Sequence, residues 1–143
     1  MVSSECEVRI LGAGDGAVFD RMSPEVFDHP IDARWSAEFL ADPRHHLAVA
    51  IDAGTVVGMA SAVHYVHPDK RPELWINEVG VASTHRGRGI AKRLLQALFA
   101  RARELGCREA WVLTDEANTI ARRLYAAAGG KESAQVMVSF DLS

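Results

Sequence analysis

The chain has few cysteines, no long apolar run and no excess of basic residues. Cys6 and Cys107 are too few for a disulfide framework, and their spacing excludes a zinc ribbon. No apolar run is long enough to cross a bilayer, and the N-terminus lacks the basic and apolar regions of a signal peptide. A formal net charge of −3 argues against nucleic acid as the main partner. We therefore expect a cytoplasmic protein that binds neither membrane nor nucleic acid.

The six histidines form no metal-binding pattern. His64 and His67 are three residues apart in a strand or turn and therefore tend to face opposite sides. His85 lies in a basic turn and is expected to be solvated, with a phosphate contact as the alternative. The other histidines are alone or in a loop: His29, His45 and His46. We expect no metal site.

Length and composition predict a single domain spanning residues 1–143. With 48% hydrophobic and 24% charged residues, the chain resembles ordinary globular proteins. Basic residues gather between residues 85 and 108, whereas acidic residues gather elsewhere. This separation suits an anionic cofactor on one side and a cationic substrate on the other, with a mixed solvated surface as the alternative. The main acidic residues are Glu25, Asp28, Asp32, Glu38, Asp42, Asp69, Glu73, Glu78, Asp115 and Glu116.

Hydrophobic periodicity predicts the element order β-α-α-β-β-β-α-β-α-β. Strands are expected at residues 7–11, 47–51, 56–66, 73–81, 108–114 and 135–140, and helices at 17–22, 32–40, 90–105 and 117–128. The strands between residues 47 and 81 are expected to be consecutive and antiparallel, with a hairpin turn at 52–55. On the last helix, we expect Ile120, Leu124 and Ala128 to face the core.

The most informative stretch is the glycine-rich turn between the strand ending at Val81 and the helix beginning near Ile90. Gly87 and Gly89 let the backbone take positive φ, and the first amides of the following helix favour a phosphate. Arg86 precedes the two glycines and Arg88 lies between them, and both can pair with phosphate oxygens. No Gly-Lys-Ser/Thr follows, and the third glycine of a dinucleotide fingerprint is missing. A basic turn without a ligand is the alternative.

Arg86-x-x-Gly89-x-Ala91, following Val79-Gly80-Val81, resembles the acyl-CoA pyrophosphate motif of the GCN5-related N-acetyltransferase (GNAT) superfamily. The element order resembles the GNAT fold over essentially the whole chain, that is, an α/β (α+β) fold with a mixed, mostly antiparallel central sheet flanked by helices. The resemblance implies a single N-acetyltransferase domain that uses acetyl-CoA as co-substrate and needs no metal. It also implies that the turn holds the pyrophosphate through Arg86, Gly87, Arg88, Gly89, Ile90 and Ala91.

Acetyl transfer to an amine requires a group that takes the amine proton and one that protonates the leaving thiolate. Glu78, a carboxylate in an otherwise apolar strand, is a candidate base, acting directly or through water; an outward-facing strand charge is the alternative. Asn118 and Tyr125 share one stripe of the last helix. The resemblance implies that Asn118 bonds the pantetheine arm and that Tyr125 is the acid; in isolation, Tyr125 would be read as a packing residue.

The resemblance further implies that the strand at Val79 and Val81 separates from the strand containing Trp111. Its free backbone groups would then pair with pantetheine as an added strand does and would polarise the thioester carbonyl. Gly80 fits a bulge or the close approach of a ligand.

Within the superfamily, the chain is most similar to the aminoglycoside 3-N-acetyltransferases, over residues 47–50, 56–60, 67–68 and 73–81 and the Arg86 motif. The region from Met22 to Phe39, which borders the acceptor site in that branch, diverges. Acidic side chains expected near the acceptor favour a small cationic amine, for example an aminoglycoside. These side chains are Asp28, Asp32, Asp69, Glu73, Asp115 and Glu116.

Two alternatives remain open for the function. One is an enzyme that acetylates proteins or peptides, and the other is a non-catalytic acyl-CoA-binding sensor, which would need neither Glu78 nor Tyr125. The family also makes a homodimer possible, with the last expected strand, Val136 to Phe140, pairing across a two-fold axis.

Overall fold

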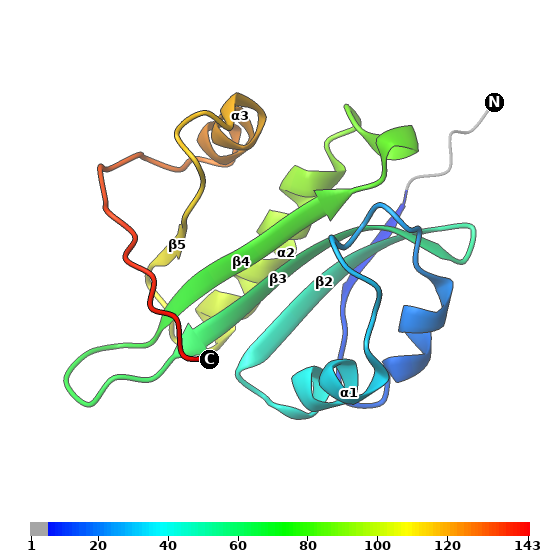
Figure 1. Ribbon diagram of the computed structural model, residues 1–143, viewed down its shortest axis with the longest axis horizontal. Helices are drawn as coiled ribbons and strands as arrows, with labels where there is room; N and C mark the ends of the chain where they lie inside the picture. The colour runs from blue at the N-terminus through cyan, green and yellow to red at the C-terminus, as the bar shows by residue number, and fades with distance from the viewer. Residues whose placement is uncertain (1–5) are drawn as a thin grey trace.

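The computed structural model describes residues 6–143, which form one five-stranded sheet with helices on both faces (Figure 1). In chain order the elements are β1 (Glu7–Ile10), the 3-10 helix η1 (Gly16–Arg21), α1 (Ala33–Ala41), β2 (His45–Asp52), β3 (Thr55–Tyr65), β4 (Glu73–Val81), the 3-10 helix η2 (Ser83–His85), α2 (Ile90–Glu104), β5 (Ala110–Val112) and α3 (Thr119–Ala127).

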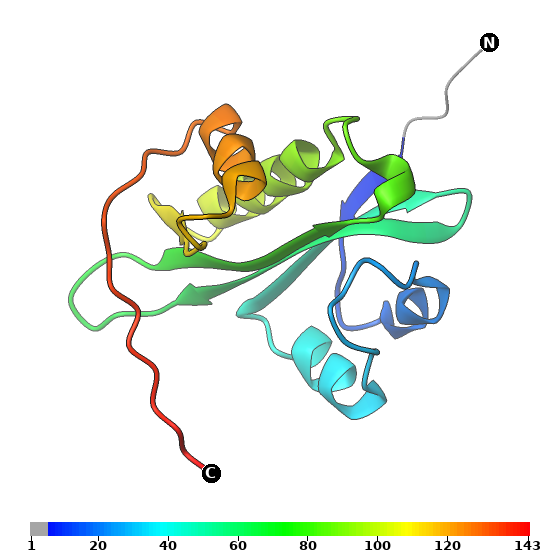
Figure 2. The same ribbon diagram turned by 45° about the horizontal axis from the view of Figure 1, so that its top comes forward.

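The strands lie in their order along the chain, from β1 to β5. The first three pairs are antiparallel, and β5 runs parallel to β4. Figure 2 shows α2 and α3 on one face of the sheet and η1 and α1 on the other. The mixed, mostly antiparallel sheet flanked by helices confirms the GNAT fold expected from the sequence.

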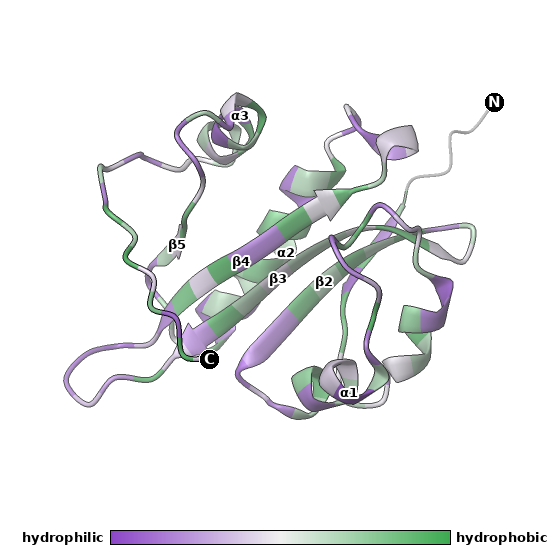
Figure 3. Cartoon of the chain, in the orientation of Figure 1, coloured by the Kyte–Doolittle hydropathy of each residue, from purple (hydrophilic) through white to green (hydrophobic). Residues whose placement is uncertain are grey.

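The core lies mainly between α2 and the middle of the sheet. Leu94, Leu95 and Leu98 of α2 are fully buried, as are Ala48 and Ala60 of β2 and β3. Figure 3 shows the hydrophobic residues running along β2 and β3. Burying three leucine side chains stabilises the fold by roughly 5–9 kcal/mol before entropy is counted. This packing holds α2, and with it the glycine-rich turn, against the sheet.

The β2–β3 hairpin forms as expected. Ala53 and Gly54 both have positive φ, 49° and 83°, which is the backbone of the two-residue turn that matches strand twist.

Among residues 6–143, no helix has the length and apolar character that crossing a membrane requires.

Three local predictions are wrong. The first expected helix is a 3-10 helix at Gly16–Arg21. Ile120, expected to face inward, is 81% exposed, whereas Leu124 and Ala128 of the same expected face pack against the core. The strand expected at residues 135–140 is not formed; the chain after Gly130 has neither helix nor strand. Strand pairing needs a neighbouring edge, and β5 extends over only three residues.

Candidate active site

A cavity of about 300 Å³ lies where the segment between η1 and α1 passes over the sheet. It is lined by Phe19, Phe27, Asp28, His29, Pro30, Ile31, Asp32, Trp35, Ser36, Phe39, Leu47, Ser61, Asn77 and Glu78. This volume is at the lower end of the range for small-molecule sites. The cavity brings the divergent region of the sequence into contact with the candidate base.

A β-bulge places Glu78 at this cavity. Ser61 of β3 pairs with Glu78, but the next residue, Ala62, pairs with Ile76, so Asn77 is the extra residue on β4. Successive strand residues normally face opposite sides, and a bulge re-aims one of them. As a result both Asn77 and Glu78 line the cavity. The sequence pattern did not indicate Asn77, because the bulge depends on how two strands register.

The rest of the cavity wall is acidic and aromatic. Asp32 caps α1, with Oδ1 accepting from the Trp35 backbone N–H at 2.9 Å. Trp35 is 71% exposed, which is unusual for so large an apolar side chain. Together with Asp28 and Glu78, these groups suit a cationic ligand with apolar ring faces. Four acids expected near the acceptor do not line this cavity: Asp69, Glu73, Asp115 and Glu116.

β4 and β5 separate halfway along β4. The two strands pair only from Leu74–Ala110 to Ile76–Val112. Beyond that point, Val79 and Val81 pair with β3 on one side, and β5 has ended (Figure 1). Residues 77–81 of β4 therefore have a second backbone edge without a strand neighbour in residues 6–143, as the resemblance implied. Such an edge can accept an extended ligand.

Gly80 has a different role from the one the sequence indicated. A Cβ at this position would collide with the backbone carbonyl oxygen of Val26. Close approach by the protein's own chain, rather than by a ligand, explains the glycine. Gly80 thereby lets the Val26 segment cover β4 beside the cavity.

The glycine-rich turn between η2 and α2 has the backbone of an anion site. Gly87 and Gly89 have φ of 76° and 75°, and a Cβ at either position would meet no atom within 4 Å. Gly89 is the N-cap residue of α2 and supplies no side chain to bond the first helix amides. The space beside the turn is therefore accessible to a phosphate, which those amides and the helix dipole favour.

Three histidines discussed from the sequence, His64, His67 and His85, each have a polar side-chain partner in the fold. His85 is not solvated: its side chain is 15% exposed, and Nε2 lies 2.6 Å from Asp52 Oδ2. His64 and His67 have different partners, as expected from their spacing. His64 Nδ1 lies 2.8 Å from His46 Nε2, whereas His67 Nε2 lies 3.3 Å from a Glu73 oxygen.

α3 carries the other two candidate residues on the α2 side of the sheet (Figure 2). Asn118 is the N-cap residue, and its Oδ1 accepts from the Ala121 backbone N–H at 3.1 Å. The Asn118 side-chain amide N–H groups point to no partner among residues 6–143. Tyr125 is half-buried against the core, and burial raises the pKa of its phenol. A raised pKa keeps the Tyr125 proton in place at neutral pH.

Comparison with known proteins agrees with this geometry. The model of the acetyltransferase (GNAT) family matches residues 17–129. Aminoglycoside N(6′)-acetyltransferase type 1 of Salmonella typhimurium is 31% identical over 115 residues, which are 76% of this chain and 79% of that relative. The resemblance to aminoglycoside acetyltransferases is therefore supported, but this relative carries N(6′) in its name rather than 3-N.

Solved structures share the fold over nearly the whole chain. The aminoglycoside N-acetyltransferase AAC(6′)-Iy in complex with CoA has a TM-score of 0.80 at 25% identity, covering 99% of this chain and 98% of that one. An aminoglycoside acetyltransferase from an uncultured soil metagenomic sample, in complex with sisomicin, has a TM-score of 0.84 at 19% identity, covering 96% and 97%. The second likeness shows the fold alone.

The family match covers most of the chain, and it includes the turn between η2 and α2, the free edge of β4 and α3. The chain therefore belongs to the acetyltransferase (GNAT) family and is an N-acetyltransferase.

Proposed function

We propose that this enzyme transfers the acetyl group of acetyl-CoA to a primary amine of a small cationic molecule, with an aminoglycoside as the candidate acceptor. The observation that carries the proposal is the position of Glu78 on β4. On one side, Glu78 lines an acidic and aromatic cavity. Three residues further along, β4 ends and leads through η2 to the glycine-rich turn. The same strand thus supports both substrates.

The acetyl-CoA half of the site comprises the turn, the free edge of β4 and the start of α3. The pyrophosphate lies against the amides of the turn, and pantetheine pairs with the backbone of Val79 and Val81. Asn118 bonds the pantetheine arm. The turn residues are Arg86, Gly87, Arg88, Gly89, Ile90 and Ala91. Support comes from the open space over the glycines and from the CoA complex of AAC(6′)-Iy.

Transfer proceeds by direct attack in a ternary complex. Glu78 takes a proton from the bound ammonium group, directly or through water, and the amine nitrogen attacks the thioester carbonyl carbon. A carbon–nitrogen bond forms, the carbon–sulfur bond breaks, and Tyr125 gives its proton to the thiolate. The second proton that the nitrogen loses on becoming an amide returns to the Tyr125 oxygen. The position of Tyr125 on α3, the helix that Asn118 caps, supports its role as the acid, and a phenol carries its proton at neutral pH. Backbone groups of β4 polarise the carbonyl.

The acceptor is argued from the cavity wall. Asp28 and Asp32 attract ammonium groups, and the exposed Trp35 ring offers a face for a sugar. The similarity to an N(6′) enzyme makes a 6′-amine the first position to test. No nucleic acid or membrane is part of the proposed reaction. The two free thiols, Cys6 and Cys107, agree with a reducing cytoplasm, where acetyl-CoA would be available.

The proposal includes a homodimer and treats residues 1–143 as a single domain. The segment after Gly130 carries apolar side chains exposed to solvent: Val136 (88%), Met137 (73%), Val138 (67%), Phe140 (81%) and Leu142 (93%). Their alternation is typical of a strand, but within residues 6–143 this segment pairs with no other strand. Pairing with a second copy would cover this surface.

The decisive experiment is acetyl-CoA-dependent thiol release with aminoglycosides, polyamines, amino acids and short peptides. We expect release with aminoglycosides and acetylation at one amine, located by NMR of the product. Release with peptides alone would indicate a protein N-acetyltransferase instead. Acetyl-CoA binding with no release from any acceptor would indicate the sensor.

Glu78→Gln separates the enzyme from a binding domain. Removing the base should lower kcat about 100-fold or more, with acetyl-CoA binding unchanged. Glu73→Gln is the matched control, because it removes a carboxylate from the other end of β4, where Glu73 pairs with Lys70. The Glu73→Gln enzyme should keep nearly full activity.

A further inference from the structure

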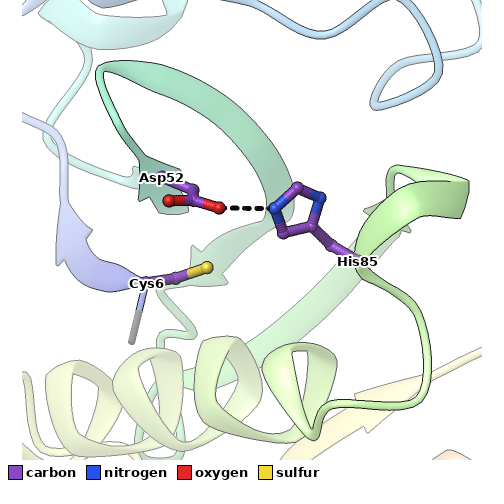
Figure 4. Close-up of side chains that lie close together, drawn as sticks. All are labelled: Cys6, Asp52 and His85. Atoms are coloured by element: carbon purple, nitrogen blue, oxygen red, sulfur yellow. Dashed lines mark hydrogen bonds and ion pairs between the residues drawn. The ribbon is translucent and has the colours of Figure 1, made fainter. Parts of the chain in front are cut away.

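Cys6, Asp52 and His85 come together at the end of the sheet next to the glycine-rich turn (Figure 4). Cys6 directly precedes β1, Asp52 ends β2, and His85 ends η2. One ligand atom from each, a thiol sulfur, a carboxylate oxygen and a ring nitrogen, lies within 4.8 Å of the other two. None of these residues has a part in the proposed acetyl transfer.

The cluster is shielded from solvent. Cys6 is 6% exposed, and the side chains of His85 and Asp52 are 15% and 25% exposed. His85 Nε2 lies 2.6 Å from Asp52 Oδ2, and His85 Nδ1 lies 2.7 Å from Thr84 Oγ1. Both ring nitrogens therefore have a partner, and the ring is held with Nε2 directed at Asp52 and Cys6.

We propose that Cys6, Asp52 and His85 bind a zinc ion. Thiolate, imidazole and carboxylate are the ligands that zinc takes in proteins, at about 2.0–2.3 Å, so three donors this close need only small side-chain movements to surround one ion. The Thr84 hydroxyl oxygen can accept from Nδ1–H, which leaves Nε2 free for the metal and fixes the orientation of the ring. The fourth position is left to water.

The charges around the cluster are compatible with a divalent cation. Zinc binding displaces the Cys6 thiol proton, so thiolate and carboxylate together neutralise the two positive charges of the ion. Arg93 lies close by, where its Nη2 donates to the Cys6 carbonyl oxygen at 2.8 Å.

The site departs from the sequence expectation of no metal. The three ligands are far apart along the chain and match no ligand spacing, so only the fold brings them together. The proposed zinc site also adjoins the glycine-rich turn, because His85 directly precedes Arg86. A bound ion would join the start of β1, the β2–β3 hairpin and η2, and would hold the turn's first residue in place.

Cobalt(II) is the probe that tests the site, because thiolate ligation gives a charge-transfer band in the near ultraviolet. The reduced full-length protein, stripped with a chelator, is titrated with Co²⁺ and then with Zn²⁺. We expect one ion per chain, the thiolate band, and its loss when Zn²⁺ replaces Co²⁺. Cys6→Ser should lose the band, whereas Cys107→Ser, which removes the other buried thiol, should keep it.

A second pair of variants keeps the test valid if Cys6→Ser fails to fold, which circular dichroism would reveal. Asp52 and His85 are half-buried, so Asp52→Asn and His85→Asn should disturb folding less. Each variant should bind Zn²⁺ at least tenfold more weakly, as measured by calorimetry. Zn²⁺ should also raise the melting temperature of the wild-type protein and of Cys107→Ser, but not that of His85→Asn. No cobalt–thiolate band in the wild-type protein, or equal zinc affinity in His85→Asn and wild type, would overturn the proposal.

Discussion

Arg86 Nε donates to the backbone carbonyl oxygen of Val81 at 3.1 Å. The bond spans η2 and joins the first residue of the glycine-rich turn to the last residue of β4. It uses one of the guanidinium donors and leaves the Nη groups for a phosphate. The residue that the sequence motif assigned to ligand binding therefore also fixes the geometry of the turn, and this double role shapes the first prediction.

Arg86→Ala should raise KM for acetyl-CoA about tenfold or more, because it removes a charge-assisted donor and loosens the turn. For Arg86→Lys, KM for acetyl-CoA should lie between the values for Arg86→Ala and the wild-type enzyme. Lysine keeps the positive charge, but its single ammonium group cannot bond the Val81 carbonyl oxygen and a phosphate as the guanidinium group does. Initial rates at varied acetyl-CoA concentration measure the effect. Arg103→Ala, at the far end of α2, is the control and should leave KM unchanged.

Tyr125→Phe should lower kcat roughly 10- to 100-fold, because the leaving thiolate loses its proton donor. The ring packing is kept, so the melting temperature should change little. The chain has one other tyrosine, Tyr65, which stacks on Trp75 with ring centroids 5.9 Å apart. Tyr65→Phe is therefore the matched control; an equal loss of kcat in both variants would contradict the assignment of Tyr125 as the acid.

Asp32→Asn should raise KM for a cationic acceptor about three- to tenfold without destabilising the protein. Asparagine caps helices as well as aspartate does, so the bond to the Trp35 N–H is retained while the charge is lost. Asp32→Ala should show the same KM change and also lose about 1 kcal/mol of stability. Glu38→Gln removes a charge from α1 away from the cavity; a KM change as large as that of Asp32→Asn would show that the cavity charge is not what matters.

The protein should lose stability between pH 6.5 and pH 4 through His46. Burial is the largest cause that lowers the pKa of His46 to about 4, together with the neighbouring His64, Arg101 and His45 and against an opposing effect of Asp42. Because the folded pKa lies below the unfolded value, the stabilisation is complete above pH 6.5 and is lost as the pH falls toward 4. The difference in the free energy of unfolding between pH 7 and pH 5 should include about 2 kcal/mol from this group.

Urea unfolding at pH 7 and pH 5 measures the change in the free energy of unfolding. A variant that lacks His46 separates the contribution of this residue from those of the other titratable groups. His46→Leu should reduce the pH dependence by roughly that amount, whereas His29→Gln, at an exposed loop position, should not. The His64 pKa is also lowered by burial, so His46→Leu should leave a smaller residual dependence.

Light scattering after size exclusion should give twice the mass of one chain. Val138→Glu should give the monomer, because a charge in the apolar segment opposes its burial in the dimer. Ser139→Glu puts the same charge on the opposite side of the expected strand, and this variant should form more dimer than Val138→Glu. A monomeric wild-type protein at working concentrations would contradict the proposed dimer.

Much of the fold follows from local sequence. The strand at residues 73–81, the hairpin at 52–55 and the helices expected at 32–40 and 90–105 were all predicted, and Asp32 is the N-cap of the first of these helices. These features depend on residues close together in the chain, namely side-chain periodicity, turn glycines and capping groups. The positive φ of Gly87 and Gly89 was likewise predicted, because the glycine-rich motif is local in the sequence.

Other features depend on segments distant in the chain. The alternation at residues 135–140 is typical of a strand, yet a strand also needs a partner, and within residues 6–143 this segment pairs with none. The role of Gly80 is set by the Val26 segment, and the second cavity residue of β4, Asn77, by a register shift against β3. None of these relationships leaves a local signal.

By itself, the sequence determined the family assignment, and it predicted the turn for acyl-CoA and the candidate residues Glu78 and Tyr125, because a glycine-rich turn and a helix stripe consist of consecutive or periodic residues. Only the tertiary structure decided which acids line the acceptor cavity and that Cys6, Asp52 and His85 converge. These groups meet because strand pairing and helix packing bring distant segments together, and such contacts are energetically determined by the whole fold rather than by neighbours in the chain.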